Sequence, residues 1–174
     1  MELSTDRLYM RPYTNHDEDF LMMMLSDPDM MRFIGNGQPK DSSGVKAFLD
    51  WIFQTYETDS TRDLHVVVRK RDHVRVGHAG LIPQHINGEN EVEIGYWVAS
   101  PFWGEGYATE AALALTKHGL ETQREPRLIA IIQPGNKASI GVAAKTGMTF
   151  EQELVHQGNT VHLYAITTDT WDSE

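Results

Sequence analysis

Two glycines at the entrance of a predicted helix are the first residues that suggest chemistry. In the stretch FWGEGYATEA, residues 102–111, Gly104 and Gly106 stand one residue apart and a helix-forming run follows at once. Such a pair indicates either a tight turn or a close approach of an anion to the backbone N–H groups. The Gly-Lys-Ser/Thr ending of a Walker loop is absent, and Thr109 stands where a dinucleotide fingerprint needs its third glycine. These residues alone leave the turn and the anion site open.

A carboxylate in an apolar strand pattern is the second candidate. Glu93 lies in EVEIGYWV, residues 91–98, where apolar residues alternate strictly with the others, and it is close to Tyr96 and Trp97. A carboxylate that is buried there has a raised pKa, which suits a general base. The alternative is that Glu91 and Glu93 both face water on a half-exposed strand.

Other kinds of site find less support in the sequence. The histidines show no His-x-x-x-His or similar spacing, so we expect no metal site. The basic run RKRDHVR, residues 69–75, is typical of a solvated hairpin turn. The chain has no cysteine, which excludes disulfides, thiolate metal sites and a cysteine nucleophile.

The elements that must position these residues follow from hydrophobic periodicity and from Gly and Pro breaks. Strands are expected over residues 3–12, 64–70, 75–82, 91–98, 127–134, 148–157 and 160–168. Helices are expected from Asn15 or Asp17 to Leu25 and over residues 42–56, 107–120 and 136–145, with a loop over 26–39. The order β-α-α-β-β-β-α-β-α-β-β predicts one α/β domain over residues 1–174, a mixed sheet of about seven strands with helices on both sides.

Composition limits the class of partner. The chain has 174 residues, 40% of them hydrophobic, which is enough for one domain with a core of its own. A net charge of −10 argues against nucleic acid, and it either favours a cationic substrate such as an amine or only keeps the protein in solution. The start MELSTDRLYMRPY lacks the apolar stretch of a signal peptide, and no window is long and apolar enough for a membrane span. We therefore expect a cytoplasmic protein without a membrane partner.

Three segments, in the same order along the chain, resemble one known family. They are LSTDRLYMRPY at residues 3–13, EIGYWVASPFWGEGYATEA at 93–111 and NKASIGVAAKTGM at 136–148. They are similar to the opening strand, the central strand with its pyrophosphate loop, and the cofactor-closing helix of the GNAT superfamily of N-acetyltransferases, in its RimJ/RimL-like branch. The resemblance implies the GNAT acyl-CoA N-acyltransferase fold, whose twisted central sheet is mostly antiparallel.

The resemblance also assigns the glycine loop to coenzyme A. In the family pattern the loop contacts the pyrophosphate, and the matching positions here are Trp103, Gly104, Glu105, Gly106, Tyr107 and Ala108, followed by Thr109. Trp103 departs from the usual Gln or Arg. Glu105 is a second departure, and we expect its carboxylate to point outward because a carboxylate beside a pyrophosphate costs energy.

Four further residues receive roles from the same resemblance. Asn136 would either hydrogen-bond the pantetheine arm or cap the helix that it opens. Ser139 would donate to the departing thiolate, although many relatives use a tyrosine for this and none is found near Ser139 in the sequence. The backbone near Val98 would stabilise the oxyanion, and Glu93 would be the general base beside the acceptor site.

The predicted function is therefore transfer of an acetyl group from acetyl-CoA to a primary amine, either a protein N-terminus or a small molecule. Direct attack in a ternary complex is expected, since no cysteine is available as an acyl carrier. One alternative is a non-catalytic acyl-CoA-binding or regulatory module with this fold, and another is nucleotide binding at the glycine loop. The partners would be acetyl-CoA and the amine, without nucleic acid or metal, and the chain would be a monomer or a homodimer.

Overall fold

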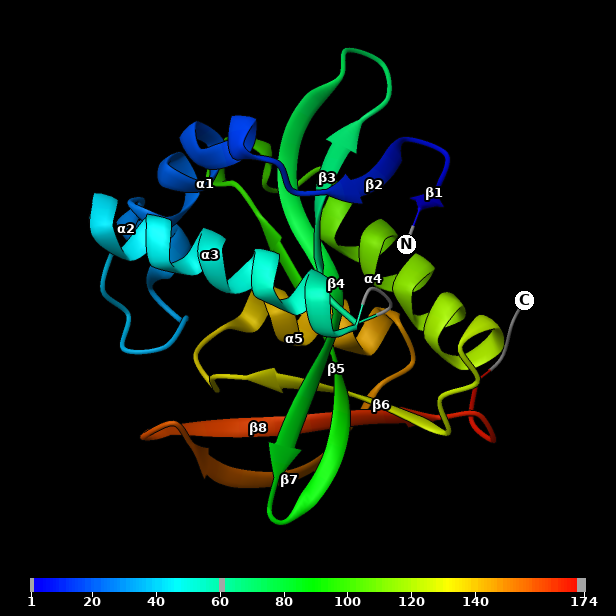
Figure 1. The fold of residues 1–174 in the computed structure, drawn as a ribbon. Helices are drawn as coiled ribbons and strands as arrows, with labels where there is room; N and C mark the ends of the chain where they lie inside the picture. The colour runs from blue at the N-terminus through cyan, green and yellow to red at the C-terminus, as the bar shows by residue number, and fades with distance from the viewer. Residues whose placement is uncertain (1, 60–61, 172–174) are drawn as a thin grey trace.

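A single eight-stranded sheet runs through the computed structural model, which describes residues 2–59 and 62–171 (Figure 1). Its strands are β1 (Leu3–Ser4), β2 (Leu8–Pro12), β3 (Leu64–Arg69), β4 (Val74–Ile86), β5 (Glu89–Val98), β6 (Arg127–Ile132), β7 (Thr149–His156) and β8 (Asn159–Thr167). They lie in the order β1-β2-β3-β4-β5-β6-β8-β7, and only the β5–β6 pair is parallel. The mixed, mostly antiparallel sheet is as predicted.

The sheet has one strand more than the expected seven because the first segment is interrupted. The strand predicted over residues 3–12 turns back on itself after Ser4, so that β1 pairs with β2. The Thr5 N–H donates to the Leu8 carbonyl at 2.9 Å, and the Leu8 N–H donates to the Thr5 hydroxyl at 3.0 Å. A side chain that bonds the backbone in this way competes with continued pairing, so the strand breaks there.

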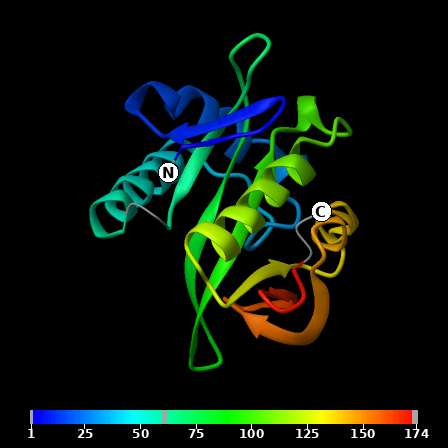
Figure 2. The same ribbon diagram turned by 90° about the vertical axis from the view of Figure 1, so that its right-hand side faces the viewer.

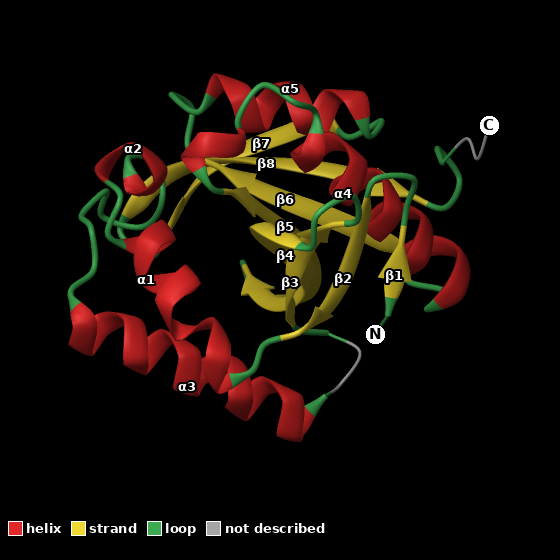
Figure 3. Cartoon of the chain, turned by 90° about the horizontal axis from the view of Figure 1, so that it is seen from above, coloured by secondary structure: helices red, strands yellow, loops and turns green. Residues whose placement is uncertain are grey.

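Helices cover both faces of the sheet, as predicted. They are α1 (Glu18–Leu25), α2 (Pro28–Met31), α3 (Ser42–Thr58), α4 (Tyr107–Lys117) and α5 (Lys137–Lys145). Figures 2 and 3 show α4 and α5 on one side of the sheet and α1 to α3 on the other. A π turn, His118–Thr122, follows α4, so the regular helix ends before the predicted residue 120.

Each face has its own hydrophobic core. Leu115 of α4 packs with Ile94 and Leu128 on one face, and Ile52 of α3 packs with Leu21 and Val66 on the other. Because side chains alternate along a strand, β5 sends Ile94, Tyr96 and Val98 toward α4 and α5 and sends Trp97 toward α3. Glu93 has the parity of Trp97 and therefore belongs to the face of α1 to α3.

The segment predicted as a loop over residues 26–39 contains α2, so that prediction was wrong in part. Asp27 caps the helix by accepting from the Asp29 N–H at 2.9 Å. Pro28 fits the first turn, because the backbone N–H that proline lacks would have no acceptor within the helix there. A helix of four residues is too short to show a periodicity in the sequence. The chain then crosses from Met31 to the cap of α3, the carboxylate of Asp41.

The β4–β5 hairpin is longer than the sequence suggested. β4 continues to Ile86, although it contains Pro83. Pro83 is tolerated because its nitrogen faces the side of β3, whose pairing with β4 ends at the Leu64–Gly80 pair. Asn87 and Gly88, with φ of 51° and 84°, form the two-residue turn that fixes the register of the hairpin.

β5 and β6 are paired along only a small part of their length. Glu93 and Ile129 are the paired residues of these two parallel strands. Within the described chain, the residues of β5 that follow Glu93 have no paired residue on β6. The two strands therefore separate toward the carboxyl end of β5. Backbone groups in the middle of the sheet become accessible there.

Candidate active site

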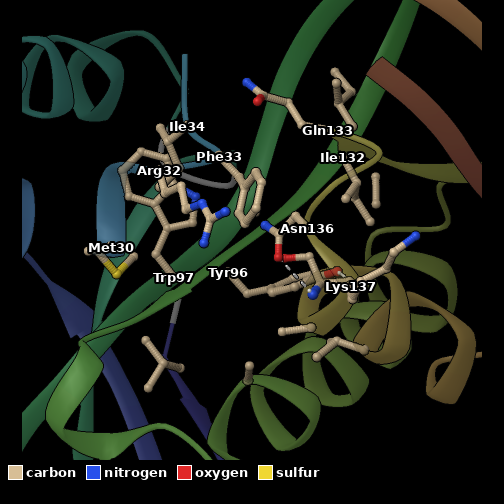
Figure 4. Close-up of a pocket in the computed structure, with 18 of the residues that line it drawn as sticks. Met30, Arg32, Phe33, Ile34, Tyr96, Trp97, Ile132, Gln133, Asn136 and Lys137 are labelled. Atoms are coloured by element: carbon tan, nitrogen blue, oxygen red, sulfur yellow. Dashed lines mark hydrogen bonds between the residues drawn. The ribbon is translucent and has the colours of Figure 1, made fainter. Parts of the chain in front are cut away.

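A cleft of about 1010 Å³ opens where β5 and β6 separate (Figure 4). The glycine loop and the start of α4 form one part of its wall, and the β6–α5 connection with α5 forms another. The far wall comes from α2 and the residues that follow it, and the β7–β8 hairpin contributes His156, Gln157 and Asn159. Glu93 and Gln84 also line the cleft, so it joins the glycine loop to the candidate base.

The glycine loop is a tight turn that leads into an uncapped helix start. Gly104 and Gly106 have φ of 80° and 81°, a conformation that other residues rarely adopt. The first hydrogen bond of α4 runs from the Glu110 N–H to the Gly106 carbonyl at 3.0 Å, and Gly106 has no side chain to cap the helix. The N–H groups of residues 107–109 therefore have no acceptor within the helix, and an anion at this helix start would satisfy them. The donors suit a pyrophosphate.

The Glu105 and Tyr107 residues of the loop contact arginines outside the cleft. Arg7 donates to the Glu105 carbonyl at 2.9 Å and to the Glu110 carboxylate at 2.6 Å, and its guanidinium lies 4.7 Å above the Tyr107 ring. The Glu105 side chain is about half exposed, 3.7 Å from Arg69, and does not line the cleft, so it points outward as expected. Of these two predicted cofactor residues, Tyr107 lines the cleft and Glu105 does not.

Val98 presents its backbone to the cleft. The Ala99 N–H donates to the Val76 carbonyl at 2.8 Å, which makes Val98 and Gly77 a non-hydrogen-bonded pair of the β4–β5 ladder. The Val98 N–H and carbonyl therefore point away from β4, toward the gap beside β6. The Trp103 indole N–H donates to the Val98 carbonyl at 2.6 Å, and the Val98 N–H remains directed at the cleft. Trp103 thus braces the loop against β5.

Glu93 lies in the cleft as a carboxylate with a raised pKa. Its burial raises the pKa to about 7, while hydrogen bonds from the Gln84 side chain and the Ile131 backbone favour the charged form and limit that rise. Gln84 donates to the Glu93 carboxylate at 2.6 Å. A group that titrates near neutral pH inside a cleft can accept a proton from a substrate.

The hypothesis that both glutamates of this strand face water was wrong. The Glu91 side chain is 14% exposed and accepts from Arg127 at 3.1 Å, so an ion pair holds it. Glu91 is not among the residues that line the cleft, whereas Glu93 is. The two carboxylates therefore differ in their surroundings, although they are only two residues apart.

Helix α5 brings Asn136 and Ser139 to the opposite wall. The Asn136 side-chain oxygen accepts from the Ser139 N–H at 3.2 Å, so Asn136 caps α5 (Figure 4). Its amide NH₂ group is still able to bond another partner. Tyr96 of β5 donates its hydroxyl to the Ser139 carbonyl at 3.0 Å, and burial raises the pKa of Tyr96. A tyrosine therefore lies beside Ser139 after all, and it comes from a strand far away in the sequence.

Two groups of cleft residues lie outside the three segments that carried the family resemblance. The first is Gln84, which the Asn-Gly turn between two strands could have revealed, because that turn places Gln84 diagonally opposite Glu93. The second is the segment after α2. Gln133 donates to the Gly35 carbonyl at 2.9 Å, and Phe33 packs against Gly135, which holds this segment across the cleft. No local pattern in the sequence signals these long-range contacts.

Residues 7–149 match the family model described as the acetyltransferase (GNAT) domain. The chain belongs to the GNAT acetyltransferase family. It is 30% identical over 179 residues to the uncharacterized N-acetyltransferase YnaD of Bacillus subtilis (strain 168), and the match covers 99% of this chain and 100% of YnaD. These matches confirm the predicted N-acetyltransferase class of this GNAT protein.

Solved GNAT structures have the same fold. An acetyltransferase (GNAT family) from Bacillus anthracis superposes with a TM-score of 0.79 at 26% identity, covering 97% of this chain and 99% of that one. RimL, a ribosomal L7/L12 alpha-N-protein acetyltransferase solved with coenzyme A, superposes with a TM-score of 0.78 at 17% identity, covering 98% and 99% of the two chains. The RimJ/RimL-like resemblance is thereby confirmed.

Two further observations concern partners of other kinds. Among the described helices of this GNAT chain, none is long and apolar enough to cross a membrane. Within residues 2–59 and 62–171, no group of three or more His, Asp and Glu side chains is arranged to hold a metal ion.

Proposed function

We propose that this GNAT enzyme transfers the acetyl group of acetyl-CoA to a primary amine by direct attack, with Glu93 as the general base. The observation that carries the proposal is the position of the Glu93 carboxylate. It lies in the same cleft as the uncapped start of α4, with a pKa of about 7. The acceptor class includes protein N-termini and small amines.

The cofactor has a matching set of donors. The N–H groups of residues 107–109 and the loop glycines would hold its pyrophosphate, and the free amide NH₂ of Asn136 would bond its pantetheine arm. When bound, acetyl-CoA supplies the activated acetyl group as a thioester. The Val98 N–H points into the gap where the acetyl carbonyl oxygen would lie, and a hydrogen bond there stabilises negative charge on that oxygen.

The amine must lose a proton before it can attack. A lysine-type ammonium has a pKa of about 10 and an α-ammonium about 8. Glu93, with a pKa of about 7, is ionised in a large share of molecules at neutral pH and accepts that proton, directly or through a water molecule. Ser139 on the other wall would donate to the sulfur as the bond to the acetyl group breaks.

Glu93→Gln tests this proposal, because it removes the proton acceptor and keeps the shape of the side chain. We expect kcat to fall by about 10²- to 10⁴-fold, the range for a lost general base, with acetyl-CoA affinity nearly unchanged. The wild-type rate should fall as the pH drops below about 7, since the carboxylate becomes protonated, and the variant should lose that acidic limb.

Glu91→Gln is the matched control, because it removes a neighbouring carboxylate outside the cleft. It should change kcat far less than Glu93→Gln does. Near wild-type turnover by Glu93→Gln would contradict the role of Glu93. Acetyl-CoA binding without turnover on a panel of amines and peptides would favour the non-catalytic module. A rise in Tm with ATP or NAD and none with CoA would favour nucleotide binding.

A further inference from the structure

We propose that Arg32 binds an anionic group of the acceptor, and that the acceptor is a primary amine with an apolar body and a carboxylate at its far end. The inference rests on the proposed function and names the substrate class of that site. The geometry that points to it is a guanidinium without a carboxylate partner in the apolar wall of the cleft, opposite α5.

Arg32 differs from most arginines of this acidic chain in its partners. Within the described residues, ion pairs with Asp or Glu are formed by Arg7, Arg11, Arg62, Arg69, Arg75 and Arg127. Arg32 forms none there, and its recorded contact is with the Phe33 ring, 5.0 Å from the guanidinium carbon. Among the arginines of the described chain, only Arg32 lines the cleft. A cation left unpaired at this place is available to a ligand.

The surroundings of Arg32 favour an apolar body. Met30, Phe33 and Ile34 lie beside it, and Trp97 of β5 forms the adjoining part of the wall (Figure 4). An aliphatic or aromatic group would pack against these side chains and exclude water. Arg32 itself is exposed, so the body of a bound acceptor would cover it, and a guanidinium–carboxylate pair becomes stronger where water is excluded.

The direction of the acceptor follows from the strand geometry. Glu93 and Trp97 project to the same face of β5, the face of α1 to α3, and α2 with Arg32 lies on that face. An amine that reaches Glu93 therefore extends its body past Trp97 toward Arg32. Lys137 and Lys145 also line the cleft, but they stand on α5, at the wall assigned to the cofactor. The cation on the acceptor side is thus Arg32.

One negative charge in the same wall would repel an anionic ligand. Asp29 of α2 lines the cleft, yet no ion pair joins it to Arg32 in the described structure. The segment that carries Arg32 is fixed by the Gln133–Gly35 hydrogen bond of 2.9 Å and by the packing of Phe33 on Gly135. Binding therefore does not have to order the backbone of this segment, and this lower ordering cost offsets part of the repulsion from Asp29.

The test compares amines that differ only in the far group. 4-(Aminomethyl)benzoate and 6-aminohexanoate are each assayed beside their neutral amides, so that the reacting amine hardly changes. Initial rates give kcat/KM for the amine and KM for acetyl-CoA, and calorimetry on the CoA-loaded protein gives the affinity of each amine. The variants are Arg32→Gln, Arg32→Lys and the control Lys40→Gln, which removes one positive charge outside the cleft wall.

We expect the wild type to prefer the carboxylate member of each pair by about 10- to 100-fold, the value of a hydrogen-bonded charge pair. Arg32→Gln should abolish this preference, Arg32→Lys should keep part of it and Lys40→Gln should keep it whole. KM for acetyl-CoA should change in none of them by more than about twofold.

Three results overturn the inference. They are equal affinity of the wild type for carboxylate and amide, no binding of either carboxylate amine, and an Arg32→Gln variant with a raised KM for acetyl-CoA and an unchanged carboxylate preference. Acetylation without a carboxylate preference would refute the role of Arg32 and leave the proposed function standing. A carboxylate preference in binding without any turnover would support Arg32 and refute the proposed function.

Discussion

The two sides of the central sheet contribute to the cleft in different ways. On the side of α4 and α5, backbone N–H groups at the start of α4 and at Val98 are directed at the cleft, beside the Asn136 and Ser139 side chains. On the side of α1 to α3, they are the side chains of Glu93, Gln84 and Arg32. The first side therefore depends in large part on backbone conformation, and the second depends on the identity of a few side chains.

The two sides of the cleft therefore differ in how well they tolerate side-chain substitutions. Backbone donors survive most side-chain substitutions, provided that the turn keeps its positive φ angles at Gly104 and Gly106. A side-chain donor or base is lost with a single substitution. This division is suited to an enzyme that keeps one cofactor and changes its acceptor, because the acceptor side can vary while the cofactor side stays intact.

The largest effect among the tests of this comparison is expected for Gly106→Val. A β-branched residue at φ of 81° costs about 1–3 kcal/mol, so acetyl-CoA affinity should fall by about 10- to 100-fold. A Cβ at this position would lie 3.4 Å from Arg7, an ordinary contact on the outer side of the loop, so backbone strain is the cause. Calorimetric titration with acetyl-CoA measures the effect.

Two variants check that interpretation. Gly106→Asn should bind nearly as well as the wild type, because Asn tolerates the left-handed conformation. Gly88→Val introduces the same strain at φ of 84° in the β4–β5 turn, and it should lower Tm without changing acetyl-CoA affinity. Unchanged affinity in a folded Gly106→Val protein would refute the backbone cradle.

A smaller effect is expected for Ser139→Ala on the α5 wall. The leaving thiolate has a conjugate acid of pKa about 8.5 and needs little help, so kcat should fall by about tenfold, the low end for acid–base catalysis. Tyr96→Phe is the comparison, since its hydroxyl lies 3.0 Å from the Ser139 carbonyl. A loss in Tyr96→Phe that far exceeds the loss in Ser139→Ala would transfer the role of proton donor to the tyrosine. Steady-state kcat at saturating substrates decides between them.

The smallest effect is expected for Gln84→Leu, which perturbs the base without removing it. Gln84 stabilises the ionised carboxylate, so its loss should raise the pKa of Glu93 above about 7. A rise of about one unit would lower the rate at pH 7 by about fivefold and leave it near wild type at pH 9. The pH profile of kcat tests this sign. An acidic limb that stays in place or moves to lower pH would contradict the assignment.

Much of the fold could be predicted from local pattern. The alternation in residues 91–98 and the apolar periodicity of residues 42–56 gave β5 and α3 nearly at their observed bounds. The predictions failed where an element is short or interrupted. The break between β1 and β2 depends on the Thr5–Leu8 hydrogen bonds, and α2 depends on one cap at Asp27. Single local bonds of this kind leave no periodic trace in the sequence.

Half of the candidate site was visible in the same way. A helix start with two glycines is a local feature, and Asn136 was expected as a possible cap of the helix it opens, so the backbone side of the cleft could be assigned from consecutive residues. The difference between Glu91 and Glu93 could not be read from their alternation, because both have the same parity. It depends on Arg127 beside one carboxylate and Gln84 beside the other.

The sequence by itself determined the order of the elements, the glycine turn and the family resemblance, because each of these is written in residues that are neighbours along the chain. Only the tertiary structure decided which side chains meet in the cleft. The Tyr96 hydroxyl contacts the Ser139 carbonyl, and Arg32 lines the same cleft as Glu93. Both follow from the separation of β5 and β6 and from the position of α2 beside the gap. Contacts between residues far apart in sequence arise from the packing of whole elements, and no local spacing encodes them.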